Sequence, residues 1–312
     1  MLMREVTEAW ELIDRPDASG RHVSNWMADK LGPHAAPRVT SLKSTDGATD
    51  VLSWTVPGTK GVARGGTAPT LAIVGRLGGV GARPSRIGTV SDADGAVVAL
   101  AVAIKLWRAA ALGDATPGDV RVVTHICPNA PTKEHPVPGQ MNSPVPFEDL
   151  LPYECPPAAA MLSVDTTRGH RILNHTGFAI TPTLYNGYIL RVSEDLMDVM
   201  TDVTNDPPVI LPVTMGDVSP SGNGVYHINS IMQPGQCFEG PLVGVATVAS
   251  AVVRGSATMA STPTTLESTS RFCVEAARRF GQGRVAFYDQ QDYDLLLERY
   301  GPMTHLVGRP RA

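Results

Sequence analysis

The chain has 312 residues, a formal net charge of −4 and 43% hydrophobic residues. This length suits one large domain, and the composition is that of a packed globular protein, which excludes a disordered chain. Scattered basic residues exclude an extended nucleic-acid surface, and no apolar run of about 20 residues is present to cross a membrane.

Four cysteines, Cys127, Cys155, Cys237 and Cys273, lie far apart in the chain and form no Cys-x-x-Cys pair. Their spacing predicts neither a disulfide framework nor a structural zinc knot. Because the first residues also lack a signal-peptide core, we expect a protein of the reducing cytoplasm.

The N-terminal segment predicts two short helices, over residues 5–13 and 21–31, with a chain-breaking stretch between them. We expect this helical pair, residues 1–35, to pack on the rest of the domain. Two strands are predicted next, over residues 38–42 and 51–56, on either side of a turn.

From residue 70 onward, short apolar runs alternate with helical segments. The predicted strands cover residues 70–74, 120–124, 160–164, 209–213, 242–249 and 284–288. The predicted helices cover residues 95–111, 193–205, 266–280 and 290–300, and the Pro-rich segment 127–157 is expected to be a loop. This alternation predicts a single α/β domain over residues 1–312, with a central, mostly parallel sheet flanked by helices. In such folds the functional site gathers at the carboxyl ends of the strands.

The first of these strands leads into a glycine-rich segment that contains Arg76, Gly78 and Gly79. Glycines let the backbone approach a ligand closely, and a guanidinium can bind a carboxylate in bidentate fashion. The spelling matches neither the dinucleotide-binding nor the P-loop pattern. An ordinary turn is the alternative.

Two acids, Asp92 and Asp94, come just before the helix predicted from residue 95. Aspartate is a good helix N-cap, so capping and a favourable position on the helix dipole explain one of them. The second acid indicates a carboxylate that binds a metal ion or acts as a general base. Both interpretations stay open.

The strand predicted over 120–124 runs into His125, Cys127 and Asn129. If the extended conformation continues, His125 and Cys127 point to the same side, because side chains alternate along a strand. They then form either a pair of metal ligands or a thiolate–imidazole pair. A buried cysteine beside a hydrogen-bonded histidine is the alternative.

Asp165 follows directly on the apolar run 160–164. Since an isolated buried carboxylate is costly, Asp165 either binds a ligand or pairs with Arg168. Further along, Asn223 and His227 belong to a Gly- and Asn-rich stretch that predicts a turn and a short helix. That stretch either delivers polar groups to a cleft or only begins a helix.

These residues resemble those of a known family. The stretches that carry the resemblance to the bacterial and archaeal domain of unknown function 1177 are Ile73–Gly88, Val90–Ala96, Thr124–Thr132, Leu162–Gly169, Gly187–Asp195 and Gly222–Ile231. The resemblance covers about residues 6–302, and it implies no established activity.

The order of the strand ends also resembles that of the co-catalytic zinc exopeptidases, which use a His after one strand, a bridging Asp before a helix and later acids. Asp92 is similar to the bridging Asp, and Asp165 is similar to the later carboxylate. Arg76 stands in place of the first His, Cys127 stands near the catalytic acid pair, and the usual dimerisation insertion is missing. The resemblance implies a zinc-exopeptidase-like scaffold with an altered metal site.

We therefore expect a metal-assisted hydrolase that cleaves an amide or peptide bond in a small peptide-like metabolite. Asp92, His125 and Asp165 would hold one divalent metal ion, zinc, which lowers the pKa of its bound water to about 7. Asp94 or His227 would transfer the proton.

On the substrate side, Arg76 would bind a carboxylate, with Gly78, Gly79, Asn129 and Asn223 beside it. No nucleic-acid or membrane partner is expected, and a homo-oligomer is compatible with the sequence.

Two alternatives remain open. One is a metal-free hydrolase or isomerase in which Cys127 is the nucleophile and His125 its base. The other is a binding protein without catalysis on an exopeptidase-like scaffold, which Arg76 favours because a guanidinium does not bind metals at neutral pH.

Overall fold

A computed structural model describes residues 1–76, 78–79, 89–133, 140–167, 172–213, 229–248, 250 and 262–306. Its α-helices are α1 (Met3–Ile13), α2 (Gly20–Leu31), α3 (Asp94–Ala111), α4 (Phe147–Glu154), α5 (Glu194–Thr204), α6 (Pro263–Gly281) and α7 (Gln290–Tyr300). Short 3₁₀ helices are η1 (Pro33–Ala35), η2 (Val62–Arg64), η3 (Ser91–Ala93), η4 (Ser230–Gln236) and η5 (Thr304–Leu306).

The strands form one large sheet and a small separate hairpin. They are β1 (Arg38–Ser44), β2 (Gly47–Val56), β3 (Leu71–Gly75), β4 (Val120–Ile126), β5 (Thr132–Lys133), β6 (Gln140–Met141), β7 (Ala160–Thr167), β8 (Gly177–Ile180), β9 (Leu184–Tyr185), β10 (Tyr188–Ile189) and β11 (Leu242–Val248). The large sheet has the order β1-β2-β4-β3-β7-β11-β9-β10, with β8 also paired to β11, and β5 pairs with β6.

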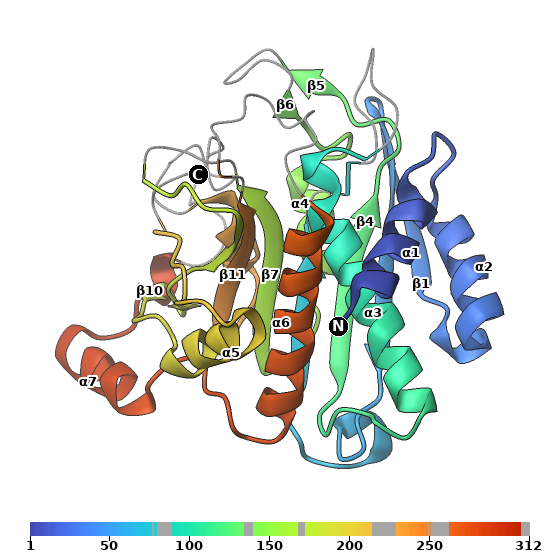
Figure 1. Cartoon of the computed structure of the whole chain (residues 1–312). Helices are drawn as coiled ribbons and strands as arrows, with labels where there is room; N and C mark the ends of the chain where they lie inside the picture. Colours follow the sequence, from blue (N-terminus) through green and yellow to red (C-terminus); the bar gives the residue numbers. More distant parts are fainter. Residues whose placement is uncertain are drawn as a thin grey trace.

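The sheet is mixed, with a parallel centre. Strands β4, β3, β7 and β11 run parallel to their neighbours in this group, whereas β1 and β2 on one side and β8, β9 and β10 on the other pair antiparallel. The predicted α/β class and the parallel core are confirmed. The carboxyl ends of the parallel strands lie together at the top of Figure 1.

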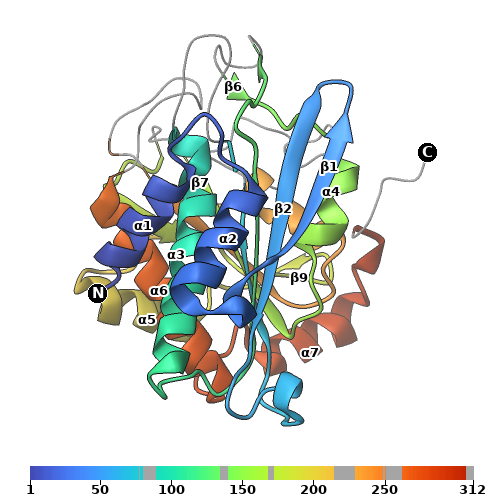
Figure 2. The same ribbon diagram turned by 90° about the vertical axis from the view of Figure 1, so that its right-hand side faces the viewer.

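Both faces of the parallel strands are buried. One face packs under α1, α3 and α6, and its core includes Ile73, Val122 and Leu162. The opposite face packs under α4 and η4, with Val74 and Met161 in its core. Figure 2 shows α3 and α6 on one side of the sheet and α4 on the other. Burial on both faces explains why these strands read as continuous apolar runs in the sequence.

Helix α3 lies unusually close to the strand ends. A side chain at Gly75 would meet the backbone at Gly95, and a side chain at Gly95 would meet the backbone of Arg76 and Val164. Glycine at both positions therefore lets the first turn of α3 touch the ends of β3 and β7. None of the described helices combines the length and apolarity that a membrane crossing requires.

Two predicted strands do not form. Residues 209–213 make only an isolated bridge between Ile210 and Ile180, because neighbouring prolines lack the N–H that a ladder needs. Residues 284–288 also stay outside the sheet. There, Ala286 N donates to Asp195 Oδ2 and its carbonyl accepts from Ser193 Oγ, so side chains at the start of α5 take the backbone hydrogen bonds.

The segment predicted as a loop over 127–157 contains a helix, α4, which has Pro152 inside it. Directly after α4, Cys155 forms a disulfide bond with Cys237, across a separation of 82 residues. The prediction that the cysteines form no disulfide is therefore wrong for this pair, because the tertiary fold brings together residues whose spacing carries no signal. Cys127 and Cys273 are free and buried.

Candidate functional site

Five of the eleven predicted site residues lie at the carboxyl edge of the parallel strands. Arg76 follows β3, His125 ends β4, Asp165 lies near the end of β7, and Asp92 and Asp94 lie at the start of α3. All five side chains are buried. Burial of so many ionisable groups at one edge of a sheet is typical of a functional site.

Asp94 is the most deeply buried of the acids, with 1% of its surface exposed. Its Oδ2 accepts a hydrogen bond of 2.8 Å from Thr247 Oγ1, at the end of β11. Burial raises the pKa of Asp94 well above its ordinary value, and the neighbouring charges of Asp92 and Asp165 raise it further. A carboxyl group with a raised pKa holds its proton at higher pH and can act as a donor.

Neither acid before α3 serves as the helix cap. Asp92 lies inside η3, Asp94 is the first residue of α3, and the N-cap position is Ala93, which makes no side-chain cap bond. Capping therefore does not explain the pair Asp92 and Asp94. They belong instead to one electrostatic group with Asp165, which we call the acid cluster.

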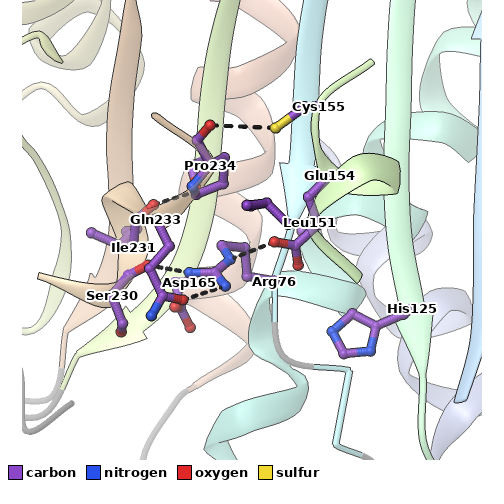
Figure 3. A network of polar contacts seen from close by, with 12 residues as sticks. Arg76, His125, Leu151, Glu154, Cys155, Asp165, Ser230, Ile231, Gln233 and Pro234 are labelled. Atoms are coloured by element: carbon purple, nitrogen blue, oxygen red, sulfur yellow. Dashed lines mark hydrogen bonds and ion pairs between the residues drawn. The ribbon is translucent and has the colours of Figure 1, made fainter. Parts of the chain in front are cut away.

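Asp165 completes the acid cluster from the sheet. Its Oδ1 accepts a hydrogen bond of 2.7 Å from the backbone N–H of Thr166. The preceding residue, Val164, accepts a hydrogen bond of 2.8 Å from Arg76 N, so Asp165 lies next to the end of β3. Figure 3 shows Asp165 beside the side chain of Arg76. The predicted alternative partner, Arg168, is outside the described residues.

The guanidinium of Arg76 is engaged by other parts of the protein. Its Nε lies 3.3 Å from Glu154 Oε2 of α4, one terminal nitrogen donates to Gln233 Oε1 at 2.7 Å, and the other donates to Ser230 O (Figure 3). The Phe147 ring lies 5.6 Å from the guanidinium carbon. A substrate carboxylate would have to displace one of these partners. With the contacts seen in the structure, Arg76 connects α4 to η4.

Both ring nitrogens of His125 have hydrogen-bond partners. Gly78 N donates to Nε2 at 3.3 Å, and Thr49 Oγ1 lies 3.1 Å from Nδ1 while it also contacts Ile126 O. A consistent arrangement places the ring proton on Nδ1, which donates to the Thr49 hydroxyl. Burial lowers the pKa of His125, and Arg76 lowers it further, whereas Glu154 opposes the shift.

These contacts decide whether the predicted metal ligands fit a metal ion. Among the described residues, no three His, Cys, Asp or Glu side chains come together as a metal-binding group. Asp92, His125 and Asp165 are all described, and His125 uses its Nε2 for Gly78. The predicted three-ligand zinc site is therefore not assembled, and we derive no chemical step through a metal ion.

Cys127 lies in a small apolar cluster with Val90, Ala130 and Met141. The ring nitrogens of His125 contact Thr49 and Gly78, so the base that a Cys127 nucleophile would need is occupied elsewhere.

The predicted substrate-binding residues are spread over different surroundings. Gly78 uses both backbone groups, its N–H toward His125 and its carbonyl toward Cys127 N. Gly79 forms an isolated bridge with Cys127, and Asn129 is exposed. Asn223 and His227 lie outside the described residues.

Sequence reasoning missed the residues that hold these groups in place. Thr247 and Thr166 hydrogen-bond to Asp94, and both stand at ends of strands that the sequence predicts. A search for hydroxyl residues at every strand end would have found them. Glu154 and Gln233 lie outside the predicted strands and helices near the site, so no comparable signal marks them.

Comparisons with known proteins complete the description of the site. Among solved structures, the chain is similar to a cytosol aminopeptidase from Coxiella burnetii, with 14% sequence identity and a TM-score of 0.46 over 89% of this chain and 68% of that chain. Among curated proteins, no match is found. A protein family with the description "Protein of unknown function (DUF1177)" matches residues 40–309. The chain therefore belongs to this family.

Proposed function

We propose that this protein hydrolyses an amide bond in a small peptide-like metabolite, and that the acid cluster of Asp92, Asp94 and Asp165 is its chemical centre. The observation that carries the proposal is the buried Asp94 carboxyl, whose pKa is raised beside two other carboxyl groups. Such an arrangement costs folding free energy, and carboxyl groups whose pKa values are pushed apart supply an acid and a base in one place.

Amide hydrolysis needs both of these groups. A carboxylate takes a proton from water while the water oxygen attacks the carbonyl carbon. A protonated carboxyl group then gives its proton to the leaving nitrogen as the C–N bond breaks, which yields a carboxylic acid and an amine. Proton transfer between the two carboxyl groups restores the starting state.

We assign the donor role to Asp94, because its pKa is raised. Asp92 is the proposed base, since it does not cap α3 and lies just ahead of Asp94 in η3. The negative charge of Asp165 raises the pKa of Asp94 and so helps Asp94 to retain its proton. In this proposal Arg76 is a positioning residue, because its nitrogens hold Glu154 and η4.

The proposal is tested by the release of free amine from a panel of dipeptides and N-acyl amino acids. Wild type is compared with Asp94→Asn, which removes the proposed proton donor, and with a control, Asp149→Asn, whose carboxylate is exposed on α4. We expect turnover in wild type and in the control, and a loss of about 100-fold or more in Asp94→Asn, the usual size of an acid–base contribution.

The outcomes separate the competing functions. Equal rates in wild type and Asp94→Asn would contradict the proposal, and loss of turnover on alkylation of Cys127 alone would favour the thiol mechanism. Saturable binding of the panel without any product would favour a binding protein. Elemental analysis of the purified protein answers the separate question of whether a divalent metal, zinc in the sequence prediction, accompanies the acid cluster.

A further inference from the structure

A second site is indicated at the outer edge of β2, on the opposite side of β4 from the acid cluster. Strand β1 begins at Arg38, which pairs with Ser53, so the last residues of β2 have no partner strand on their outer side. A cavity of about 460 Å³ lies there. We call it the β2-edge groove; its volume is in the range of pockets that bind small metabolites.

Two arginines project into the groove from the same face of the sheet. Arg38 pairs with Ser53 and Arg121 pairs with Thr55, and these two partners are two residues apart on β2. Because side chains alternate along a strand, all four point to one face. Arg38, Arg121 and both hydroxyl residues line the groove.

The groove is positively charged without a compensating acid. No Asp or Glu lines it, and neither Arg38 nor Arg121 forms an ion pair with a described residue. Other arginines of the chain, such as Arg108 with Glu8 and Arg279 with Glu275, do form ion pairs. In a chain with a net charge of −4, two unpaired guanidinium groups on one cavity are a place for an anion.

Aromatic rings form much of the rest of the wall. Two of the four tryptophans of the chain, Trp54 and Trp107, line the groove together with His34 and Tyr153. Trp54 lies between Ser53 and Thr55 on β2, so its side chain points to the face opposite the arginines, where it packs near Trp107, and the groove reaches both faces around the open edge of β2. The His34 and Trp107 rings stack edge-on at 5.0 Å. The Trp107 indole N–H is buried and has no acceptor among the described residues, so a ligand oxygen would satisfy it.

We propose that the β2-edge groove binds a small compound that contains both a phosphate group and an aromatic ring system, of the size of a nucleoside monophosphate. The guanidinium groups of Arg38 and Arg121 and the hydroxyls of Ser53 and Thr55 bind the phosphate oxygens. The aromatic wall packs against the ring. The proposal does not depend on the hydrolase function, because none of the groove residues belongs to the acid cluster.

Isothermal titration calorimetry tests the site with three probes: adenosine monophosphate, inorganic phosphate and adenosine. We expect adenosine monophosphate to bind more tightly than phosphate, and adenosine to bind most weakly, because the phosphate supplies the charge. Arg38→Ala and Arg121→Gln should each lower the affinity for adenosine monophosphate by about tenfold, which corresponds to the loss of one charge-assisted hydrogen bond. Arg64→Ala, an exposed arginine outside the groove, is the matched control and should bind as wild type does.

Thermal unfolding of each variant verifies that it is folded, and Arg38, which is exposed, tolerates substitution most readily. The proposal is overturned if wild type gives no saturable binding of adenosine monophosphate. It is also overturned if adenosine binds as tightly as adenosine monophosphate, or if Arg38→Ala binds as wild type does. Phosphate binding with no gain from the ring would overturn the aromatic part alone.

Discussion

Aspartate side chains are seldom fully buried, and the surroundings of Asp94 explain how the fold accommodates its carboxyl group. Thr247 donates a hydrogen bond to it, and the charges of Asp92 and Asp165 lie close enough to raise its pKa. A buried acid that is stabilised mainly in its protonated form weakens the protein once it must ionise.

Asp94→Asn is expected to change how stability depends on pH. In the folded protein the pKa of Asp94 lies well above its ordinary 3.8, so the native state holds a proton that the unfolded chain releases. Its contribution is fully present below pH 3.8 and is lost as the pH rises through the folded pKa. Between about pH 4 and about pH 8, the melting temperature should therefore fall less in Asp94→Asn than in wild type. Parallel curves would contradict the raised pKa.

His125 should act in the opposite direction. Its folded pKa lies below the ordinary 6.5, so its contribution is present above pH 6.5 and is lost as the pH falls through the folded pKa. His125→Gln removes this titration, and the stability of the variant should fall less than that of wild type on acidification. The free energy of unfolding is measured by urea denaturation at several pH values. If it depends on pH equally in His125→Gln and in wild type, the lowered pKa of His125 is contradicted.

At the scale of elements, two sets of contacts connect α4 to η4 on one face of the sheet. Arg76 holds Glu154 of α4 and Gln233 of η4, and the disulfide between Cys155 and Cys237 joins the residues that follow these two helices. Cys155 Sγ also lies 3.3 Å from the carbonyl of Pro234 in η4. The Arg76 contacts and the disulfide therefore both connect α4 to η4 on this face of the sheet.

The disulfide should contribute measurably to stability. A bond across 82 residues constrains the unfolded chain, and its loss should cost about 2–4 kcal/mol. The double variant Cys155→Ser/Cys237→Ser should therefore unfold at a lower temperature than wild type. Dithiothreitol should lower the melting temperature of wild type but not that of the variant. Unchanged melting with reductant would contradict this, and a thiol titration of the native protein, whose other two cysteines are buried, checks that the bond forms.

The ion pair should show the asymmetry of buried charges. Arg76 and Glu154 side chains are 4% and 5% exposed, so Arg76→Met leaves a buried carboxylate unpaired and should cost about 3–5 kcal/mol. The double variant Arg76→Met/Glu154→Leu removes both charges and should recover much of that loss in urea unfolding. A double variant as unstable as the single one would show that Arg76 acts through Ser230 and Gln233 instead.

For the whole molecule, the sequence predicts the parallel centre well because its strands are buried on both faces and appear as short apolar runs. It also predicts that Asp92, Asp94 and Asp165 share one edge, since each follows or precedes such an element. It does not predict that Thr49 engages His125 or that Glu154 engages Arg76, because those contacts join segments with no shared pattern. The prolines around residues 207–212 prevented one predicted strand, a local effect that overrides an apolar run.

The role of the acid cluster is tested most directly by the rate of amide hydrolysis in Asp92→Asn, measured against wild type on the substrate that the panel selects. Asparagine has nearly the same shape as aspartate but carries no charge. Because the N-cap of α3 is Ala93, the substitution does not remove a helix cap. We expect the melting temperature to stay close to that of wild type while turnover falls by about 100-fold or more. Wild-type turnover in Asp92→Asn, with the protein folded, would contradict the assignment of this edge of the sheet as the chemical centre.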